Sequence, residues 1–405
     1  MSTIIPILIF LLILGIVVFV HELGHYLGAK RAGVFVEEFA LGMGPLLLSF
    51  RGKWESVGGD EAQTLYSLRM FPIGGFCKMR GQDDENDPSD DRSLNNKTIP
   101  QRMLVMAGGS IMNFILAFIV FFSLTALEGY RVAEIRGVVD GSPAQQAGLQ
   151  TGDHITHING TRVTLYENFL LQLEFSGGEE LDVRFRRDGQ RHHVALTPVY
   201  GSDGIWRMGI YPGGRVGLLQ RTAEGWNFMR PVPEGFNRVS VWGTATTAAE
   251  MMLFNIRLPF TILARRLNNQ NIPDGANIMG PIGMAGELTG LYQHVITEHG
   301  VIQTILTMLF FTALLSTALG LFNLLPIPAM DGARLVFLLI EGIRRKPVPP
   351  EREGMVHLIG FILIITLAIV IAWRDIVRLL PSNEEAAAPR MEYQTRLPEY
   401  IEYNP

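Results

Sequence analysis

Residues 4–29, IIPILIFLLILGIVVFVHELGHYLGA, decide the fold. Residues 4–20 carry no polar side chain, and they run without a turn signal into the polar group HELGH at residues 21–25. A helix needs about 20 apolar residues to cross a bilayer, so this stretch predicts a membrane helix that carries the polar group. A secretory signal peptide is the alternative, but residues 1–6 contain no Lys or Arg and the apolar run ends in HELGH. We therefore expect a retained membrane helix over residues 1–30.

The composition of the whole chain agrees with a membrane protein. Of 405 residues, 48% are hydrophobic and 18% are charged, whereas soluble domains carry about 25% charged residues. The 34 Lys and Arg against 39 Asp and Glu leave a net charge of −5, so there is no basic excess to bind nucleic acid. The single cysteine, Cys77, excludes an internal disulfide and a cysteine metal cluster. Any metal site must therefore use His, Asp and Glu.

Three more apolar segments of spanning length follow, at residues 103–127, 301–325 and 355–373. Lys and Arg are concentrated between the first two segments and between the last two. Because these residues favour the cytoplasmic side, we expect both connections in the cytoplasm. Both termini and the long section 128–300 then lie outside it. The sequence thus predicts four spans in a lipid bilayer.

The remaining chain divides by composition. Apolar runs alternate with glycines over residues 33–79, which predicts short strands. The acidic run 83–91 lacks the ligand and glycine spacing of a calcium loop, so we expect a solvated loop. Strand patterns with Gly, Asp and Asn turns fill residues 132–213, with one helix expected at 165–175. Residues 234–266 have a helical pattern interrupted by Arg257 and Pro259, which favours an amphipathic or interfacial helix.

The expected fold class is therefore a multi-span α-helical membrane protein with four transmembrane helices, a membrane-associated β region and an inserted β-rich domain. The predicted segments are 1–30 (first span), 31–99 (cytoplasmic-side β region and acidic loop), 100–128 (second span), 129–214 (extracytoplasmic β-rich domain), 215–300 (interfacial helical region), 301–332 (third span), 333–380 (a cytoplasmic-side helix and the fourth span) and 381–405 (a flexible extracytoplasmic tail).

The strongest chemical signal is the group His21-Glu22-Leu23-Gly24-His25. Histidines at positions i and i+4 share one face of a helix and can occupy two positions of a tetrahedral zinc site. Glu22 lies beside them and can accept a proton from water. Polar residues at a helix end can also be merely interfacial. However, ionisable groups at membrane depth are costly and usually mark function, which favours a zinc site.

A third ligand is available at the end of the third span, in the sequence NLLPIPAMDG over residues 323–332. Asp331 lies on the same side of the membrane as HELGH, and three protein ligands leave one position open, as in catalytic zinc sites. Pro326 and Pro328 break the helix and expose backbone groups that could pair with an extended substrate. Asp331 could also serve as a helix cap before residues 332–341, and this role need not exclude the first.

Beyond these motifs, the chain resembles the site-2 proteases, and among them the bacterial zinc metalloproteases of regulated intramembrane proteolysis that carry one PDZ domain. The resemblance covers nearly all of the sequence. It rests on FVHELGHYLGAKRAGV, FPIGGFCKM, AGGSIMNFILA, MGPIGMAGELTG and NLLPIPAMDGARLVFLLIEGIRRKPVPPEREGMVHLIGF. It implies a Zn²⁺ cofactor bound by His21, His25 and Asp331, with Glu22 as the general base. It also implies that Asn323 orients the substrate backbone or stabilises the oxyanion.

The resemblance and the glycine-rich strand together suggest where substrate binds. The segment FPIGGF is the candidate for holding an unwound substrate in extended form. The second span departs from the family pattern because Gly109-Ser110 replaces Gly-Pro, although Asn113 matches. Ala333 replaces the second glycine of Leu-Asp-Gly-Gly, which leaves the ligand intact. The expected substrate-binding residues are Ile73, Gly74, Gly75, Phe76, Asn113, Pro326 and Pro328.

The β-rich insert resembles a permuted bacterial PDZ domain through VVDGSPAQQAGLQTGDHITHINGTRV. In the permuted form the peptide-binding loop comes late in the domain, where backbone N–H groups could bind a peptide terminus. The insert could equally be a steric plug over the membrane site. The expected groove residues are Arg207, Met208, Gly209 and Ile210.

The predicted function is hydrolysis of peptide bonds in the transmembrane segments of single-span proteins, such as pre-cleaved anti-sigma factors or remnant signal peptides. The resemblance implies a bacterial inner membrane location and an upstream site-1 protease that acts on the same substrate. The alternative is a PDZ-containing membrane scaffold or chaperone with a non-catalytic zinc site, but such a site would not need Glu22. A zinc transporter is disfavoured because no second intramembrane ligand group is apparent.

Overall fold

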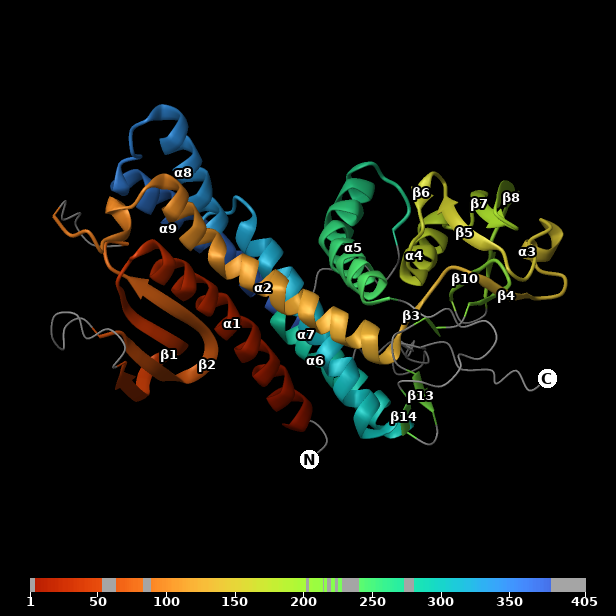
Figure 1. Ribbon diagram of the computed structural model, residues 1–405, viewed down its shortest axis with the longest axis horizontal. Helices are drawn as coiled ribbons and strands as arrows, with labels where there is room; N and C mark the ends of the chain where they lie inside the picture. The colour runs from red at the N-terminus through yellow and green to blue at the C-terminus, as the bar shows by residue number, and fades with distance from the viewer. Residues whose placement is uncertain are drawn as a thin grey trace. The chain divides into compact units, whose positions relative to one another are not determined.

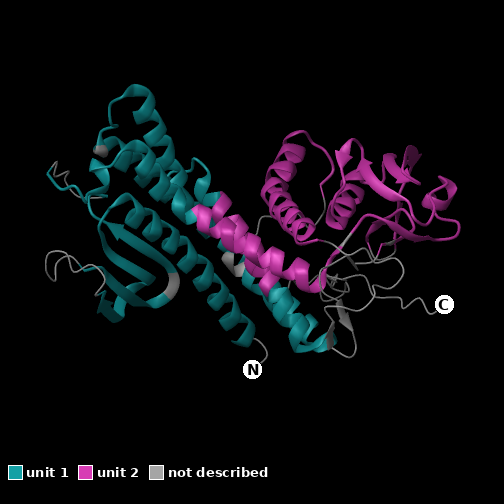
Figure 2. Ribbon diagram, viewed as in Figure 1, with its two compact units in different colours: residues 1–109, 278–308, 322–405 teal, residues 110–277, 309–321 magenta. Residues whose placement is uncertain are grey.

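The structure is a computed structural model that describes residues 4–52, 63–82, 89–201, 204–213, 215–216, 220–222, 225–227, 240–272 and 280–379. The predicted tail at 381–405 and most of the acidic loop lie outside the described residues. The chain forms two compact units. Unit 1 comprises residues 1–109, 278–308 and 322–405, and unit 2 comprises residues 110–277 and 309–321 (Figure 2).

Four helices of the described chain are long and apolar enough to cross a membrane, which confirms the four predicted spans. Helix α1 continues past residue 20 and through the HELGH group, because nothing in that sequence stops a helix. Helix α7 ends where Leu325 precedes Pro326, since a residue before proline is driven out of the helical region. The four are α1 (Ile4–Ala32), α2 (Ile99–Glu128), α7 (Gly300–Leu324) and α9 (Pro350–Leu379) (Figure 1).

In unit 1, helices α1 and α2 approach each other backbone to backbone. A Cβ added at Gly24 would collide with the carbonyl of Gly108, and one added at Gly28 would lie 3.1 Å from the Cα of Val105. Glycines permit such close packing of helices within membranes. The contact holds the HELGH turn of α1 directly against α2.

A strongly bent β-hairpin follows α1 and consists of β1 (Val36–Arg51) and β2 (Leu65–Met79). Residues 38–41 pair with residues 75–78 and also with residues 65–68, so each long strand contributes two segments to one sheet. Positive φ angles at Gly42, Gly44 and Gly74 permit the bends. The last segment of β2 packs against α1 (Figure 1).

A hydrophobic cluster joins this hairpin to α1 and α2 and to the helix α8 (Asp331–Arg344). Arg102 of α2 donates two 2.9 Å hydrogen bonds to the carboxylate of Glu341 and so links α2 to α8. The short helix η3 (Leu94–Asn96) leads into α2 and contributes a buried leucine. The fully or nearly buried members of the cluster include Ala29, Val36, Cys77, Val105 and Leu338.

Helix α6 (Pro281–Glu298) contacts both α1 and α9. The carboxylate of Asp375, a residue of α9 that is only 3% exposed, accepts hydrogen bonds from the backbone N–H groups of Gly280 and Gly283 at 3.0 and 2.9 Å. The first amides of a helix have no partner within the helix. Asp375 therefore supplies the N-terminal cap of α6 from a different helix.

Unit 2 contains the β-rich domain, whose main sheet has the order β6-β5-β7-β8. Its core includes Ile135, Ile155, Phe169 and Leu181 and lies within residues 133–210. The elements are β3 (Tyr130–Arg131), β4 (Ile135–Val138), α3 (Pro143–Gln146), β5 (His154–Ile158), β6 (Thr161–Arg162), α4 (Tyr166–Ser176), β7 (Leu181–Arg187), β8 (Gln190–Leu196), β9 (Val199–Tyr200), β10 (Trp206–Arg207), β11 (Ile210–Pro212), β12 (Arg215–Val216), β13 (Gln220–Thr222) and β14 (Gly225–Asn227).

Helix α5 (Val241–Leu267) agrees with the helical pattern expected from residue 234 onward and is continuous through Pro259, while residues 234–239 lie outside the described residues. Its amphipathic or interfacial character stays a prediction. Proline lacks the backbone N–H that would otherwise donate to the carbonyl of Asn255, four residues earlier. The first half of the helix also packs on the membrane helices of unit 2, where Ala248 is fully buried with Phe121 and Ala313.

Candidate metal centre

His21 and His25 lie one turn apart on the buried face of α1, with only 7% and 6% of each residue exposed. The Nδ1–H of His25 donates to the carbonyl oxygen of Val105 on α2 at 2.9 Å. That bond fixes the ring and leaves Nε2 as the free lone pair, which is the way metal-binding histidines are oriented. The Nε2 atoms of the two histidines lie 3.2 Å apart.

Asp331 completes a triangle with the two rings. Its Oδ2 lies 3.2 Å from Nε2 of His21 and 3.1 Å from Nε2 of His25. Asp331 is the first residue of α8, and Met330 occupies the N-cap position. The carboxylate of Asp331 faces the two histidines.

The donor triangle has the size that a zinc ion requires. Bonds of about 2.0–2.1 Å in a tetrahedral site place neighbouring ligand atoms about 3.3 Å apart, close to the three observed distances. One carboxylate oxygen and two imidazole nitrogens in a buried place form a donor set that suits a zinc ion. Among the described residues this is the group whose donor atoms converge in this way.

Gly109 of α2 forms the wall of this site. A Cβ added there would lie 2.6 Å from both Cε1 of His21 and Nε2 of His25, inside the contact distance of real atoms. Any larger residue would push into the space between the rings. In the sequence alone, Gly109 is only part of a departure from the family motif, and its role at this site was not predicted. The pair Gly108-Gly109 inside an apolar helix is the sequence signal that could have indicated it.

Glu22, half-buried on α1, lies beside the β-hairpin. A Cβ added at Gly75 would be 3.2 Å from Cγ of Glu22, so the absence of a side chain lets the strand pass close to the carboxylate. The backbone N–H of Cys77 is a hydrogen-bond donor to that carboxylate. The structure thus brings the glycine-rich segment next to Glu22, while the role of this segment in substrate binding stays a prediction.

The other residues of that segment have different surroundings. Gly74 adopts a positive φ of 82° and marks the bend of β2, and the ring of Phe76 lies under the guanidinium of Arg69 at 5.0 Å. The side chain of Ile73 lies outside the described residues, although its backbone belongs to β2. Burial raises the pKa of the Cys77 thiol well above its ordinary value, and the charge of Glu22 raises it further. Cys77 is therefore a neutral core residue.

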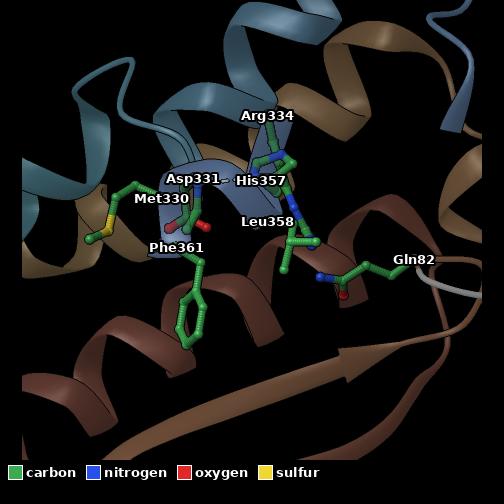
Figure 3. Close-up of a pocket in the computed structure, with 8 residues that line it drawn as sticks. Gln82, Met330, Asp331, Arg334, His357, Leu358 and Phe361 are labelled. Carbon is green, nitrogen blue, oxygen red and sulfur yellow. Dashed lines mark hydrogen bonds between the residues drawn. The ribbon is translucent and has the colours of Figure 1, made fainter. Parts of the chain in front are cut away.

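The loop between α7 and α8 carries three further expected residues. Asn323 is half-buried in the last turn of α7, and Pro326 and Pro328 follow in the loop. Pro328 packs against Gly360 of α9, where no Cβ would fit. Next to Asp331 the loop borders a cavity of about 430 Å³ (Figure 3). The cavity is lined by Gln82, Ala329, Met330, Asp331, Arg334, His357, Leu358 and Phe361.

Asn113 is a fully buried residue of α2 that lies against α7 within unit 2. Its backbone carbonyl accepts a 2.8 Å hydrogen bond from the hydroxyl of Ser316, and Gly320 of α7 packs against its Cβ. Asn113 therefore contributes to the contact between α2 and α7. Its predicted role in substrate binding stays a prediction.

The four expected groove residues also lie in unit 2 and run from the end of β10 to the start of β11. Met208 is 1% exposed and belongs to the core, so only its backbone could face a peptide. Its carbonyl accepts from the N–H of Ala144, and the carbonyl of Gly209 accepts from the N–H of Val139. Gly209 has a positive φ of 82°. Arg207 ends β10, and Ile210 begins β11.

Comparison with known proteins shows to which family the chain belongs. The sequence profile of peptidase family M50 matches residues 9–367. The chain belongs to peptidase family M50. Relatives of this M50 peptidase include the zinc metalloprotease RasP of Shouchella clausii, which is 30% identical over 92% of this chain and 99% of the relative. Another is the regulator of sigma-W protease RasP of Bacillus subtilis, which is 28% identical over 91% of this chain and 98% of the relative.

Among solved structures, this M50 peptidase has a match to the PDZ domain of the SdrC-like protein from Listeria monocytogenes. The identity is 19%, and the match covers 22% of this chain and 90% of that chain. The TM-score of 0.18 is too low to indicate a shared fold.

Proposed function

We propose that this M50 peptidase hydrolyses peptide bonds in the membrane-spanning segments of single-span proteins, with His21, His25 and Asp331 as its zinc ligands and Glu22 as its general base. Family and relatives together make the chain a zinc metalloprotease of the site-2 type and a multi-pass bacterial membrane protein. The observation that carries the residue roles is the buried triangle of donor atoms, with Glu22 next to both histidines on an apolar helix.

Zinc, when bound, supplies Lewis acidity that polarises the scissile carbonyl and makes water more acidic. The protein provides the proton acceptor. Glu22 takes a proton from the attacking water and returns it to the leaving amine. Asn323, at the end of α7, is the proposed donor to the backbone of the substrate or to its oxyanion.

The substrate must become extended before it can be cut, because a helix hides its carbonyls in its own hydrogen bonds. The edge of the hairpin at residues 75–78 is the proposed docking strand. In the described part of the chain these residues pair with residues 38–41 and with no other strand. Gly75 brings this strand next to Glu22. An added substrate strand would then run past the metal centre.

The sidedness of the molecule follows from its basic residues. We place the metal centre near the cytoplasmic side of a bacterial inner membrane, and both termini and the β-rich domain outside the cytoplasm. We propose that residues 129–214 form a PDZ domain that rejects substrates whose outer part has not been removed by an upstream site-1 protease. Anti-sigma factors are one fitting substrate class, since a relative is named regulator of sigma-W protease. Cleavage of intact and shortened substrates after deletion of the domain tests this filter.

The test of the reaction is the substitution Glu22→Gln. The amide keeps the size of the side chain but does not accept the proton, so we expect full zinc content and a loss of cleavage of about a hundredfold or more. Zinc is measured by metal analysis of the purified protein, and cleavage with a single-span substrate in liposomes. His21→Ala is the comparison, which should lose both zinc and activity.

Unchanged cleavage by the Glu22→Gln protein would contradict the role of Glu22. It would leave the scaffold or chaperone alternative, in which a metal site serves only structure. The same variant, if inactive with zinc bound, can be used to trap membrane proteins and identify the natural substrates.

A further inference from the structure

The loop before Asp331 contains a backbone conformation that needs support. Ala329 has a φ of +73°, and it is one of few described residues other than glycine in this left-handed region. A Cβ makes this region unfavourable for an L-residue. Ala329 precedes Asp331 by only two residues, so its conformation sets the direction in which the Asp331 carboxylate leaves the loop.

Helix α9 holds that loop at two neighbouring points. The backbone N–H of Ala329 donates to Nδ1 of His357 at 2.9 Å. One turn further along α9, Gly360 lies so close to Pro328 that a Cβ there would collide with the proline ring. His357 and Asp331 both line the cavity beside the metal centre (Figure 3). The two contacts fix the residues that come immediately before the ligand.

We propose that His357 is a positioning residue for the metal centre. Its Nδ1 stabilises the left-handed conformation of Ala329 and so holds Asp331 in the ligand triangle. The required ring form is neutral, with Nδ1 as acceptor and the proton on Nε2. Partners that orient a ligand typically change metal affinity by about 10-fold to 100-fold when they are lost. The inference rests on the proposed role of Asp331 as a ligand.

The test compares four variants in the full-length protein, with zinc affinity measured by competition against a chelator. His357→Leu removes the acceptor, and we expect affinity to fall about tenfold. His357→Asn places a carbonyl oxygen near the position of Nδ1 and should restore most of the loss. Ala329→Gly removes the cost of positive φ, so adding His357→Leu to it should have a smaller effect than in the wild type.

A control variant lies on the same helix. Leu363 is 65% exposed and takes part in neither of the two loop contacts named above, so Leu363→Ala should leave zinc affinity unchanged. Melting temperatures of all variants separate loss of the metal site from loss of the fold. If His357→Asn were as damaging as His357→Leu, or if Ala329→Gly did not reduce the effect of His357→Leu, the positioning role would be wrong.

The outcome is distinguishable from failure of the metal site itself. Asp331→Asn should abolish tight zinc binding if Asp331 is a ligand. Loss of zinc in Asp331→Asn, combined with unchanged affinity in His357→Leu, overturns the role of His357 alone. Retention of tight zinc binding in Asp331→Asn overturns both proposals.

Discussion

Gly109 shows how a residue without a side chain contributes to a metal site. Because a Cβ there would lie 2.6 Å from both histidine rings, Gly109→Ala must displace His21 or His25. We expect zinc affinity to fall at least about tenfold, as when a ligand loses its orientation. Chelator competition on the purified protein provides the measurement.

Gly15→Ala is the matched control for this substitution. Gly15 also lies within a membrane helix, but no heavy atom is within 4 Å of its added Cβ, so alanine should be neutral or slightly stabilising. Wild-type zinc affinity in Gly109→Ala would show that the metal does not lie between the rings.

Residues whose role follows from spacing or position were predictable from the sequence. His21 and His25 were predicted because the i and i+4 positions share one face of any helix, and Asp331 because it lies at the end of the third span, on the same side of the membrane as HELGH. Gly109 and His357 were not singled out for these roles. Their importance depends on contacts between helices far apart in sequence, with His25 and Ala329 respectively, which no local pattern records.

At the scale of single elements, helix α6 depends on a cap that another helix provides. Asp375→Ala would leave the buried N–H groups of Gly280 and Gly283 without their acceptor. We expect a loss of about 1–2 kcal/mol in stability, the usual effect of removing a helix cap. Thermal unfolding in detergent and limited proteolysis near residue 280 provide the measurements, with the first cleavage expected at the start of α6.

Thr366→Ala on the same helix is the control, since the hydroxyl of Thr366 bonds only to the carbonyl of Ile362 within α9. Asp375→Asn keeps one oxygen acceptor and should be intermediate. Equal melting temperatures for Asp375→Ala and Thr366→Ala would show that the cap does not hold α6.

Elements were predictable where one local signal dominates. Hydropathy over about 20 residues identifies a membrane span. Pro326 was predicted to break the helix, and α7 ends just before it. By contrast, Pro259 does not end α5, which continues to Leu267. The double pairing of residues 38–41 was also not predictable. Register between segments depends on bends at glycines, and a strand pattern does not specify its partners.

At the scale of the whole molecule, the β-rich domain has a core of its own within residues 133–210. Buried Asp153 adds two 2.7 Å hydrogen bonds from Arg187 within the same domain. A domain with an independent core can be deleted without opening the core of unit 1. We therefore expect a protein lacking residues 132–213 to retain its zinc.

If the domain is a size filter, the deleted protein should cut intact and shortened substrates at similar rates, whereas the full chain should prefer the shortened ones. Cleavage in liposomes with a matched pair of substrates measures the ratio. A preference that survives deletion in a zinc-loaded protein would contradict the filter.

Helix α9 has a practical consequence for handling the protein outside a bilayer. In the most apolar 18-residue stretch of α9, only 6% of the residues are buried within the protein. Lipid tails must therefore cover the others. His357 and Asp375 both belong to this helix, of which little is buried against the rest of the protein. A harsh detergent that strips those lipids would loosen α9 before the tightly packed α1 and α2, and the sample would lose its metal while its helical content still looked intact. Zinc content is thus a better guide than circular dichroism when choosing conditions for purification.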